Sequence, residues 1–313
     1  MSIESLRADI VEIGRRMYAR GYTASNDGNI SVRVGDDRLL MTPKSVCKGF
    51  MTPDMMCVTD LAGKKIQGDR DPSSEMLMHL EVYRQRPDVR AVVHAHPPTA
   101  TGFAVAGIPL DRAVLAEVLT TLGSIPLAEY ATPSTDELPG AVRKYIKAHD
   151  GMLLANHGAL TVGGDLYSAY YKMETVEHFA KISLVARMLG RENLISREEV
   201  IRLQGLRGTY GIQAPAPICL DPDIPGGSGP STSAQVVVAG PEDAATCQTV
   251  QAPAGTGLRL VPDRDLDFDG INRRLRATGA LRPAQGEAGG EAEIRLTYRE
   301  LSALIEDAIK NLR

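Results

Sequence analysis

The first twenty residues carry apolar side chains at intervals of three or four positions. Leu6, Ile10, Ile13 and Met17 therefore share one face of a helix. Gly21 follows this pattern and suits the left-handed backbone that commonly closes a helix. The spacing predicts an amphipathic helix over residues 2–20.

Shorter apolar runs follow, with turn residues between them. Residues 30–34 and 38–41 flank Gly-Asp-Asp and predict a β-hairpin, and residues 56–59 predict a third strand. The polar run with proline at 71–75 predicts a helix start, and Arg86-Pro87 its end. A strand over 91–96 comes next.

The second half continues this mixture of helices and strands. Helical patterns cover residues 98–106, 112–122 and 135–148. They are followed by a strand over 152–155, an Asn-His-Gly turn, a strand over 159–162 and a long helix over 165–189. No strict strand–helix–strand alternation runs through the chain, and no G-x-G-x-x-G follows a strand. The pattern predicts an α/β or α+β sandwich and disfavours a dinucleotide-binding fold.

The composition changes after Gln213. Residues 214–290 contain 9 prolines and 11 glycines, a proportion typical of a linker. The last residues, 294–313, contain a Thr-x-x-Glu capping box and apolar side chains on one helical face. We expect a catalytic domain over 1–213, a poorly ordered linker over 214–293 and an amphipathic helical tail over 294–313.

Charge and composition narrow the class of partner. The net charge is −4 and the pI is about 5.9. No basic field attracts nucleic acid or an anionic membrane, so a small molecule or a protein is the expected partner. The charged N-terminus has no apolar run typical of a signal peptide. Four cysteines without C-x-x-C spacing indicate free thiols, and we expect a cytoplasmic protein.

Three histidines and one carboxylate form a candidate metal site. Side chains alternate along a strand, so His94 and His96 project to the same side. His157 follows an apolar strand, and Glu75 stands at a predicted helix start. Three imidazoles and a carboxylate suit Zn²⁺. The other three histidines lie in charged helical patterns without a partner at ligand spacing and are expected at the surface or in the core: His79, His149 and His178.

Small polar segments near Glu75 predict a phosphate site. Ser73 and Ser74 precede Glu75 at a helix start, where free backbone N–H groups favour an anion. Asn-Asp-Gly-Asn at 26–29 and Thr-Pro-Lys-Ser at 42–45 are turns that can form anion-binding nests. The lysine of the second turn adds a positive charge. Taken singly, these segments are better explained as a helix cap and ordinary turns, and only their occurrence together with the histidines favours a phosphate site.

Together these motifs resemble the class II aldolase/adducin family, and most closely its L-fuculose-1-phosphate aldolase branch. The resemblance covers about residues 5–212. Its landmarks stand in family order: G-N at 28–29, T-P at 42–43, P-S-S-E at 72–75, V-V-H-A-H at 92–96, A-E-Y-A-T at 128–132 and N-H-G at 156–158.

The resemblance implies a fold and a set of roles. The expected fold is an α/β/α sandwich with a central, mainly antiparallel sheet, assembled as a homotetramer. The implied ligands of one zinc ion per subunit are Glu75, His94, His96 and His157, with Glu75 also serving as acid/base. The implied phosphate-binding residues are Asn29, Lys44, Ser45, Ser73 and Ser74. Tyr210, in a G-T-Y-G context, matches a tyrosine that reaches a neighbouring active site, or is an ordinary packing residue.

One departure from the family concerns the aldehyde pocket. The aldolase has a second active-site tyrosine in a segment that here, at residues 104–129, contains none. Glu117 lies in this segment, either as a substitute polar group or, more in keeping with its setting, as a surface charge. The exact sugar is therefore open.

The expected reaction is cleavage of a ketose 1-phosphate to dihydroxyacetone phosphate and a short aldehyde such as lactaldehyde. The alternatives are a sugar-phosphate epimerase or dehydratase of the same fold, or an adducin-like scaffold without chemistry. The tail over 294–313 resembles encapsulation peptides of bacterial microcompartments, which would dock on a shell or cargo protein. Packing of that tail on its own tetramer is the competing interpretation.

Overall fold

The computed structural model describes residues 2–209, Ile212 and Ile218. The expectations for Tyr210, for the linker over 214–293 and for the tail over 294–313 lie outside the described residues. They stay predictions from the sequence.

A single eight-stranded sheet forms the centre of the described residues. Its strand order is β4-β3-β2-β1-β5-β8-β7-β6, and every neighbouring pair is antiparallel except β6 with β7. The strands are β1 (Asn29–Val34), β2 (Arg38–Met41), β3 (Cys57–Asp60), β4 (Lys65–Gln67), β5 (Ala91–Ala95), β6 (Leu127–Ala128), β7 (Gly151–Leu154) and β8 (Gly158–Gly163). The expected mixed fold with a mainly antiparallel sheet is confirmed.

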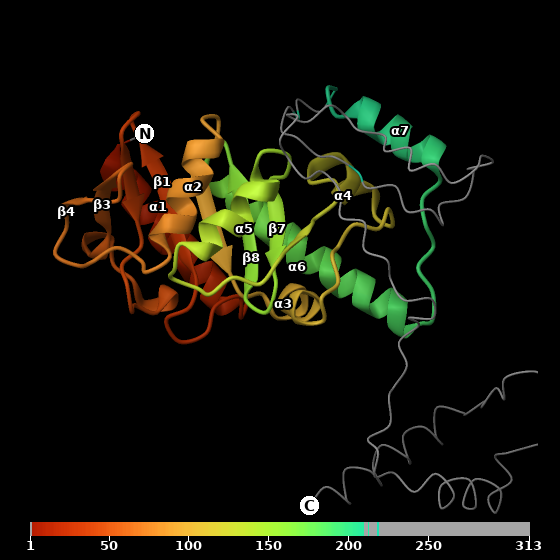
Figure 1. Cartoon of the computed structure of the whole chain (residues 1–313), viewed down its shortest axis with the longest axis horizontal. Coiled ribbons are helices and arrows are strands. Elements are labelled where there is room, and N and C mark those ends of the chain that lie inside the picture. Colours follow the sequence, from red (N-terminus) through yellow and green to blue (C-terminus); the bar gives the residue numbers. More distant parts are fainter. Residues whose placement is uncertain (1, 210–211, 213–217, 219–313) are drawn as a thin grey trace, which may run out of the picture. The chain divides into compact units, whose positions relative to one another are not determined.

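Helices cover both faces of this sheet (Figure 1). The first core lies under α1, α3 and α6, and the second lies under α2 and α5. The apolar residues of the strands alternate between these two cores, as Val93 and Val92 do on β5. The helices are α1 (Ile3–Ala19), α2 (Met76–Gln85), α3 (Pro98–Val105), α4 (Ala116–Thr121), α5 (Glu137–Ile146), α6 (Leu166–Met188) and α7 (Arg197–Leu206).

Five elements were not predicted from the sequence, and two of them are single-turn 3-10 helices, η1 (Lys48–Phe50) and η2 (Pro53–Met55). Strands β4 and β6 have only three and two residues, too few to show an alternation. Helix α7 begins after Ser196, whose side chain accepts a hydrogen bond from the Glu199 amide. This Ser-x-x-Glu spacing was a readable start signal. The helix expected over 112–122 was too long, because only Ala116–Thr121 is helical.

The register of the central strands places the functional residues. Asn29 on β1 lies directly opposite His94 on β5, and His94 lies opposite Leu160 on β8. Since side chains two apart share a face, Asn29 and Ser31 point with His94 toward the layer that holds α2. Within the described residues, none of the helices has the length and apolar character that a membrane crossing requires.

Candidate metal centre

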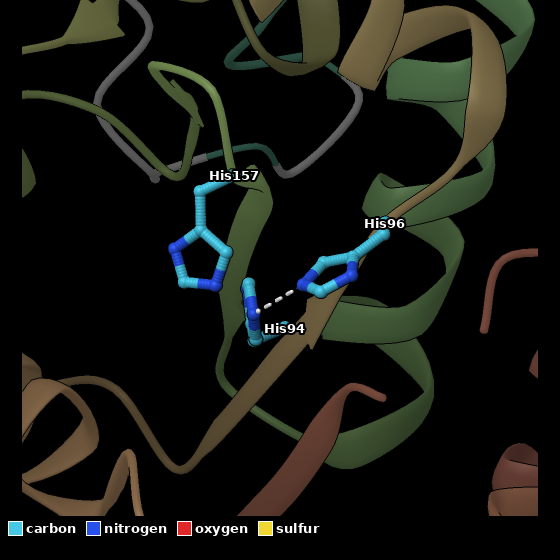
Figure 2. A group of neighbouring side chains, drawn as sticks. All are labelled: His94, His96 and His157. Carbon is cyan, nitrogen blue, oxygen red and sulfur yellow. Dashed lines mark hydrogen bonds between the residues drawn. The ribbon is translucent and has the colours of Figure 1, made fainter. Parts of the chain in front are cut away.

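Three imidazoles converge where strand β5 ends and strand β8 begins. His94 lies on β5, His96 directly follows it, and His157 directly precedes β8 (Figure 2). Their ligand nitrogens lie within 4.8 Å of one another. The Nε2 atoms of His94 and His96 are 3.1 Å apart. The alternation along a single strand thus brings the two histidines of the H-A-H motif to one point.

Glu75 closes the group from the N-terminal end of α2. Its Oε2 atom lies 3.2 Å from His94 Nε2, and its Oε1 atom lies 3.1 Å from His157 Nε2. The Oε1 contact does not have hydrogen-bond geometry, and this oxygen is buried without another partner among the described residues. The carboxylate therefore faces the histidine nitrogens without being fully satisfied by them.

The donor set fits a divalent metal ion. His94 Nδ1 lies 2.9 Å from the Ala159 carbonyl, to which it donates, so its Nε2 atom presents a lone pair. In a tetrahedral site with bonds of 2.0–2.1 Å, ligand atoms are separated by about 3.3 Å. The separations of 3.1 to 3.2 Å that link Glu75, His94, His96 and His157 match this spacing. We call these four residues the metal end.

The Asn-His-Gly turn explains how His157 reaches the site. Asn156 has a φ of 55°, which asparagine tolerates better than most residues. At Gly158 an added Cβ would lie 2.5 Å from both the Ala95 carbonyl oxygen and the His96 ring. Only glycine lets β8 start this close to β5, so the motif serves both the turn and the close approach.

The electrostatics of this group favour an ionised carboxylate. Burial by itself raises the pKa of Glu75, but the facing His94 and His157 imidazoles outweigh it and hold that pKa far below its ordinary range. Burial, followed by the charges of His94 and His157, lowers the pKa of His96 to about 4. A negative carboxylate and a neutral His96 are the forms that bind a cation.

Two of the three segments predicted to bind phosphate, those at 42–45 and 73–74, lie side by side. Pro43 and Pro72 form an antiparallel bridge, the Lys44 amide donates to the Asp71 carbonyl at 2.9 Å, and the Ser73 amide donates to the Thr42 carbonyl at 3.2 Å. Ser73 is buried and its hydroxyl accepts from the Glu75 amide at 3.3 Å. We call Ser73, Lys44, Ser45 and Ser74 the phosphate end. The last three of these residues are exposed.

Asn29, also predicted to bind phosphate, has a contact that the sequence did not suggest. Its side-chain nitrogen donates to Glu75 Oε2 at 2.8 Å. Asn29 is nearly buried and is the last residue of the Asn-Asp-Gly-Asn turn. It therefore connects that turn with the metal end.

Two further residues near the site were missed in the sequence. Lys48 is buried and donates from Nζ to the carbonyls of Asn26 and Val46, at 3.0 and 2.6 Å. It ties the turn at 26–29 to Val46, the residue directly after the turn at 42–45. Asp27 Oδ2 lies 3.5 Å from His96 Nδ1, the ring atom opposite the ligand nitrogen. A lysine or an aspartate in a polar turn gives no distinctive sequence signal.

The remaining candidates lie apart from this group. Glu117 is exposed on α4, as expected for a surface charge. His178 is exposed on α6, and His149 is buried with its Nδ1 atom 2.9 Å from the Ser124 carbonyl. Tyr210 is outside the described residues, so its role is untested.

Comparison with known proteins agrees with this architecture. Residues 8–184 match the family model described as the class II aldolase and adducin N-terminal domain. This match spans more than half of the chain. The protein belongs to the class II aldolase/adducin family.

Relatives with two different reactions are similar to this chain. A 3-oxo-tetronate 4-phosphate decarboxylase of Pectobacterium atrosepticum is 31% identical over 59% of this chain and 86% of its own length. An L-fuculose phosphate aldolase of Methanococcus maripaludis is 33% identical over 58% of this chain and 97% of its own length. A solved L-fuculose 1-phosphate aldolase superposes with a TM-score of 0.62 at 30% identity, covering 66% of this chain and 97% of that one.

Proposed function

We propose that this protein is a zinc-dependent aldolase. It cleaves a ketose 1-phosphate of the L-fuculose 1-phosphate type to dihydroxyacetone phosphate and a short aldehyde such as lactaldehyde. The observation that carries the proposal is the convergence of three histidine nitrogens on the Glu75 carboxylate, beside a serine-bearing turn.

Cleavage of the bond between C3 and C4 leaves negative charge shared between C3 and the C2 carbonyl oxygen. A divalent ion held by His94, His96 and His157 would act as a Lewis acid toward that charge. Ser73, Ser74, Lys44 and Ser45 would bind the phosphate and set which carbon meets Glu75. Asn29 would contribute an amide hydrogen to the same anion.

Glu75 would carry the proton that the reaction moves at C3. The free carboxylate is ionised, so it can accept a proton from a substrate hydroxyl and return it to C3 after the bond breaks. The C4 hydroxyl loses its proton as the aldehyde forms, and this proton restores the substrate hydroxyl that Glu75 deprotonated. Tyr210 is our prediction for the group that transfers it.

Decarboxylation of a 3-oxo acid 4-phosphate is the second candidate. Loss of CO₂ from 3-oxo-tetronate 4-phosphate leaves the same three-carbon carbanion, and its protonation also gives dihydroxyacetone phosphate. This reaction needs no base for a departing aldehyde. Two observations favour decarboxylation as the second candidate: residues 104–129 contain no tyrosine, and the chain is similar to a decarboxylase.

The two candidates must be separated by their second product, because dihydroxyacetone phosphate is common to both. Purified protein would be incubated with a panel of ketose 1-phosphates and with 3-oxo-tetronate 4-phosphate, and dihydroxyacetone phosphate, aldehyde and CO₂ would be quantified. We expect equal amounts of dihydroxyacetone phosphate and aldehyde. Release with CO₂ from the oxo acid alone supports the second candidate, and no product from metal-loaded protein contradicts both. An epimerase or dehydratase would consume substrate without releasing dihydroxyacetone phosphate.

Assembly and location complete the proposal. We infer a cytoplasmic homotetramer, supported by the similarity to L-fuculose phosphate aldolases. The tail over 294–313 would bind a shell or cargo protein of a microcompartment, which would retain the aldehyde. A fluorescent reporter fused to residues 291–313 should co-localise with shells, and a diffuse reporter would argue for packing of the tail on its own tetramer.

A further inference from the structure

A buried chain of hydrogen bonds leads away from Glu75 into the protein. Asn29 donates to Glu75 Oε2 at 2.8 Å, and His79 Nε2 lies 2.5 Å from Asn29 Oδ1. Ser31 Oγ lies 2.7 Å from His79 Nδ1 and 2.9 Å from the Tyr83 hydroxyl. His79 and Ser31 are fully buried, and Asn29 and Tyr83 nearly so.

This chain of hydrogen bonds is possible because residues along α2 and along β1 recur at matching distances. Glu75, His79 and Tyr83 are four residues apart and lie on one side of α2, where four residues rise about 6 Å. Asn29 and Ser31 are two apart on β1, where two residues advance about 6.6 Å. The two series therefore interleave, and each strand residue sits between two helix residues.

The directions of these hydrogen bonds are set by chemistry. The Asn29 amide nitrogen donates to Glu75 Oε2, so the Asn29 oxygen faces His79 and can only accept from it. His79 must then carry its hydrogen on Nε2, which leaves Nδ1 to accept from Ser31. Tyr83 in turn donates to Ser31. Burial, and after it the neighbouring His94, lowers the pKa of His79 to about 3, in keeping with the neutral ring of this arrangement.

We propose that His79 is a positioning residue, which holds the Asn29 carboxamide so that its nitrogen faces Glu75 and the substrate. Without the Nε2 hydrogen, the Asn29 amide could rotate and present its oxygen to the Glu75 carboxylate, where two acceptors would repel. In the part of the chain that the structure describes, Glu75 is the acceptor for this nitrogen. The second amide hydrogen remains for the phosphate.

The inference rests on the proposed function for the substrate, but the metal end can be tested without turnover. A pair of amide substitutions offers the sharpest test. In His79→Gln the amide nitrogen can reach the place of Nε2, whereas in His79→Asn it falls near Nδ1, away from Asn29. Both put a neutral amide in the same buried site. The matched control is His149→Gln, a buried histidine bonded to the Ser124 carbonyl instead.

Each variant would be loaded with Co²⁺ and examined by its visible absorption spectrum, and its zinc affinity would be measured by chelator competition. Substitution of a residue that holds a metal ligand in place typically lowers metal affinity or activity by about 10- to 100-fold. We expect a loss in this range and an altered cobalt spectrum in His79→Asn, with near-normal values in His79→Gln and His149→Gln. Where turnover is detected, kcat should fall in His79→Asn and stay near normal in His79→Gln and His149→Gln.

Two results would overturn the proposal. One is an unchanged spectrum and affinity in folded His79→Asn. The other is an equal loss in His79→Gln and His79→Asn. If both variants fail to fold, Ser31→Ala takes their place, because it removes the donor that keeps the hydrogen on Nε2. A several-fold loss with a changed spectrum supports the proposal, and wild-type values contradict it. A protein without aldolase or decarboxylase activity would contradict the proposed function while leaving these metal measurements decisive.

Discussion

The two ends of the site are built in different ways. The metal end is supported by the register of β1, β5 and β8, and His94 is completely buried with its Nδ1 atom bonded to a strand carbonyl. The phosphate end consists of turns, and Lys44, Ser45 and Ser74 are exposed. A rigid sheet can prearrange a metal site before substrate arrives, whereas the exposed side chains of Lys44, Ser45 and Ser74 can be ordered by the anion when it binds.

This difference predicts that changes at the metal end reduce the chemical step and changes at the phosphate end reduce substrate binding. Glu75→Gln should show the largest effect. The amide cannot carry the proton, so we expect kcat to fall by about 10²- to 10⁴-fold while the fold is retained. The measurements are kcat and thermal unfolding.

Glu81→Gln is the matched control for this variant. Glu81 is a buried carboxylate on the same helix, where it contacts Arg143 and Gln85. Its kcat should stay within a few-fold of the wild type. Near-normal turnover in Glu75→Gln would remove Glu75 from the chemistry.

Lys48 tests how the turns of the phosphate end are held. Burial lowers the pKa of Lys48 from the ordinary 10.5 to about 8, despite the nearby Cys47, Asp27 and Glu75. Between these pH values the unfolded chain binds the extra proton, so this residue makes the free energy of unfolding rise with pH. One pH unit corresponds to about 1.4 kcal/mol, which sets an upper limit of about 3 kcal/mol.

The measurement is the free energy of unfolding of wild type and Lys48→Met from pH 7 to 10.5. Burial also raises the pKa of Cys57 to about 11, which makes the free energy of unfolding fall with pH. Both proteins contain Cys57, so the difference between them isolates Lys48. Wild type should gain stability relative to Lys48→Met across this range. Parallel curves would show that Lys48 does not titrate as described.

Ser73→Ala should weaken substrate binding more than catalysis. Ser73 is the buried member of the phosphate end, and a hydrogen bond to a charged group contributes about 1.5–3 kcal/mol. We therefore expect KM to rise by about 10- to 100-fold, with a parallel loss of inhibition by inorganic phosphate. Ser183→Ala, at a buried serine of α6, should leave both values unchanged. A fall in kcat at constant KM would move Ser73 to the metal end.

Lys44→Met should have the smallest effect. The Lys44 side chain is exposed, and salt screens such charges. KM should rise by roughly two- to five-fold at low ionic strength and return toward the wild-type value in high salt. Lys64→Met, at another exposed lysine, serves as the control. A large effect that salt does not reduce would mean that Lys44 is enclosed when substrate binds.

The main elements could be predicted from the sequence, and the four residues that it proposed as metal ligands lie close together in the structure. Two-residue alternation placed His94 and His96 on one side of a strand, and an apolar run followed by Asn-His-Gly located His157. The convergence of these residues with Glu75 required the register between strands. That register depends on strand partners far apart in the sequence, such as Asn29 with His94 and His94 with Leu160.

Other parts could not be predicted from local patterns. The three residues of β4 are all exposed and carry no alternation between buried and exposed positions. His79 shows no ligand spacing, and its connection to Glu75 exists only because α2 packs on β1 with matched repeats. Lys48 acquires its role from carbonyls of two separate turns.

X-ray absorption spectroscopy at the metal edge of the purified wild-type protein would test the central claim most directly. We predict one divalent ion bound by three imidazole nitrogens and a carboxylate oxygen at about 2.0–2.1 Å. Addition of dihydroxyacetone phosphate should keep the imidazoles and change the oxygen shell. A metal-free protein that stays metal-free when zinc is supplied, or a metal bound without histidine, would contradict the account.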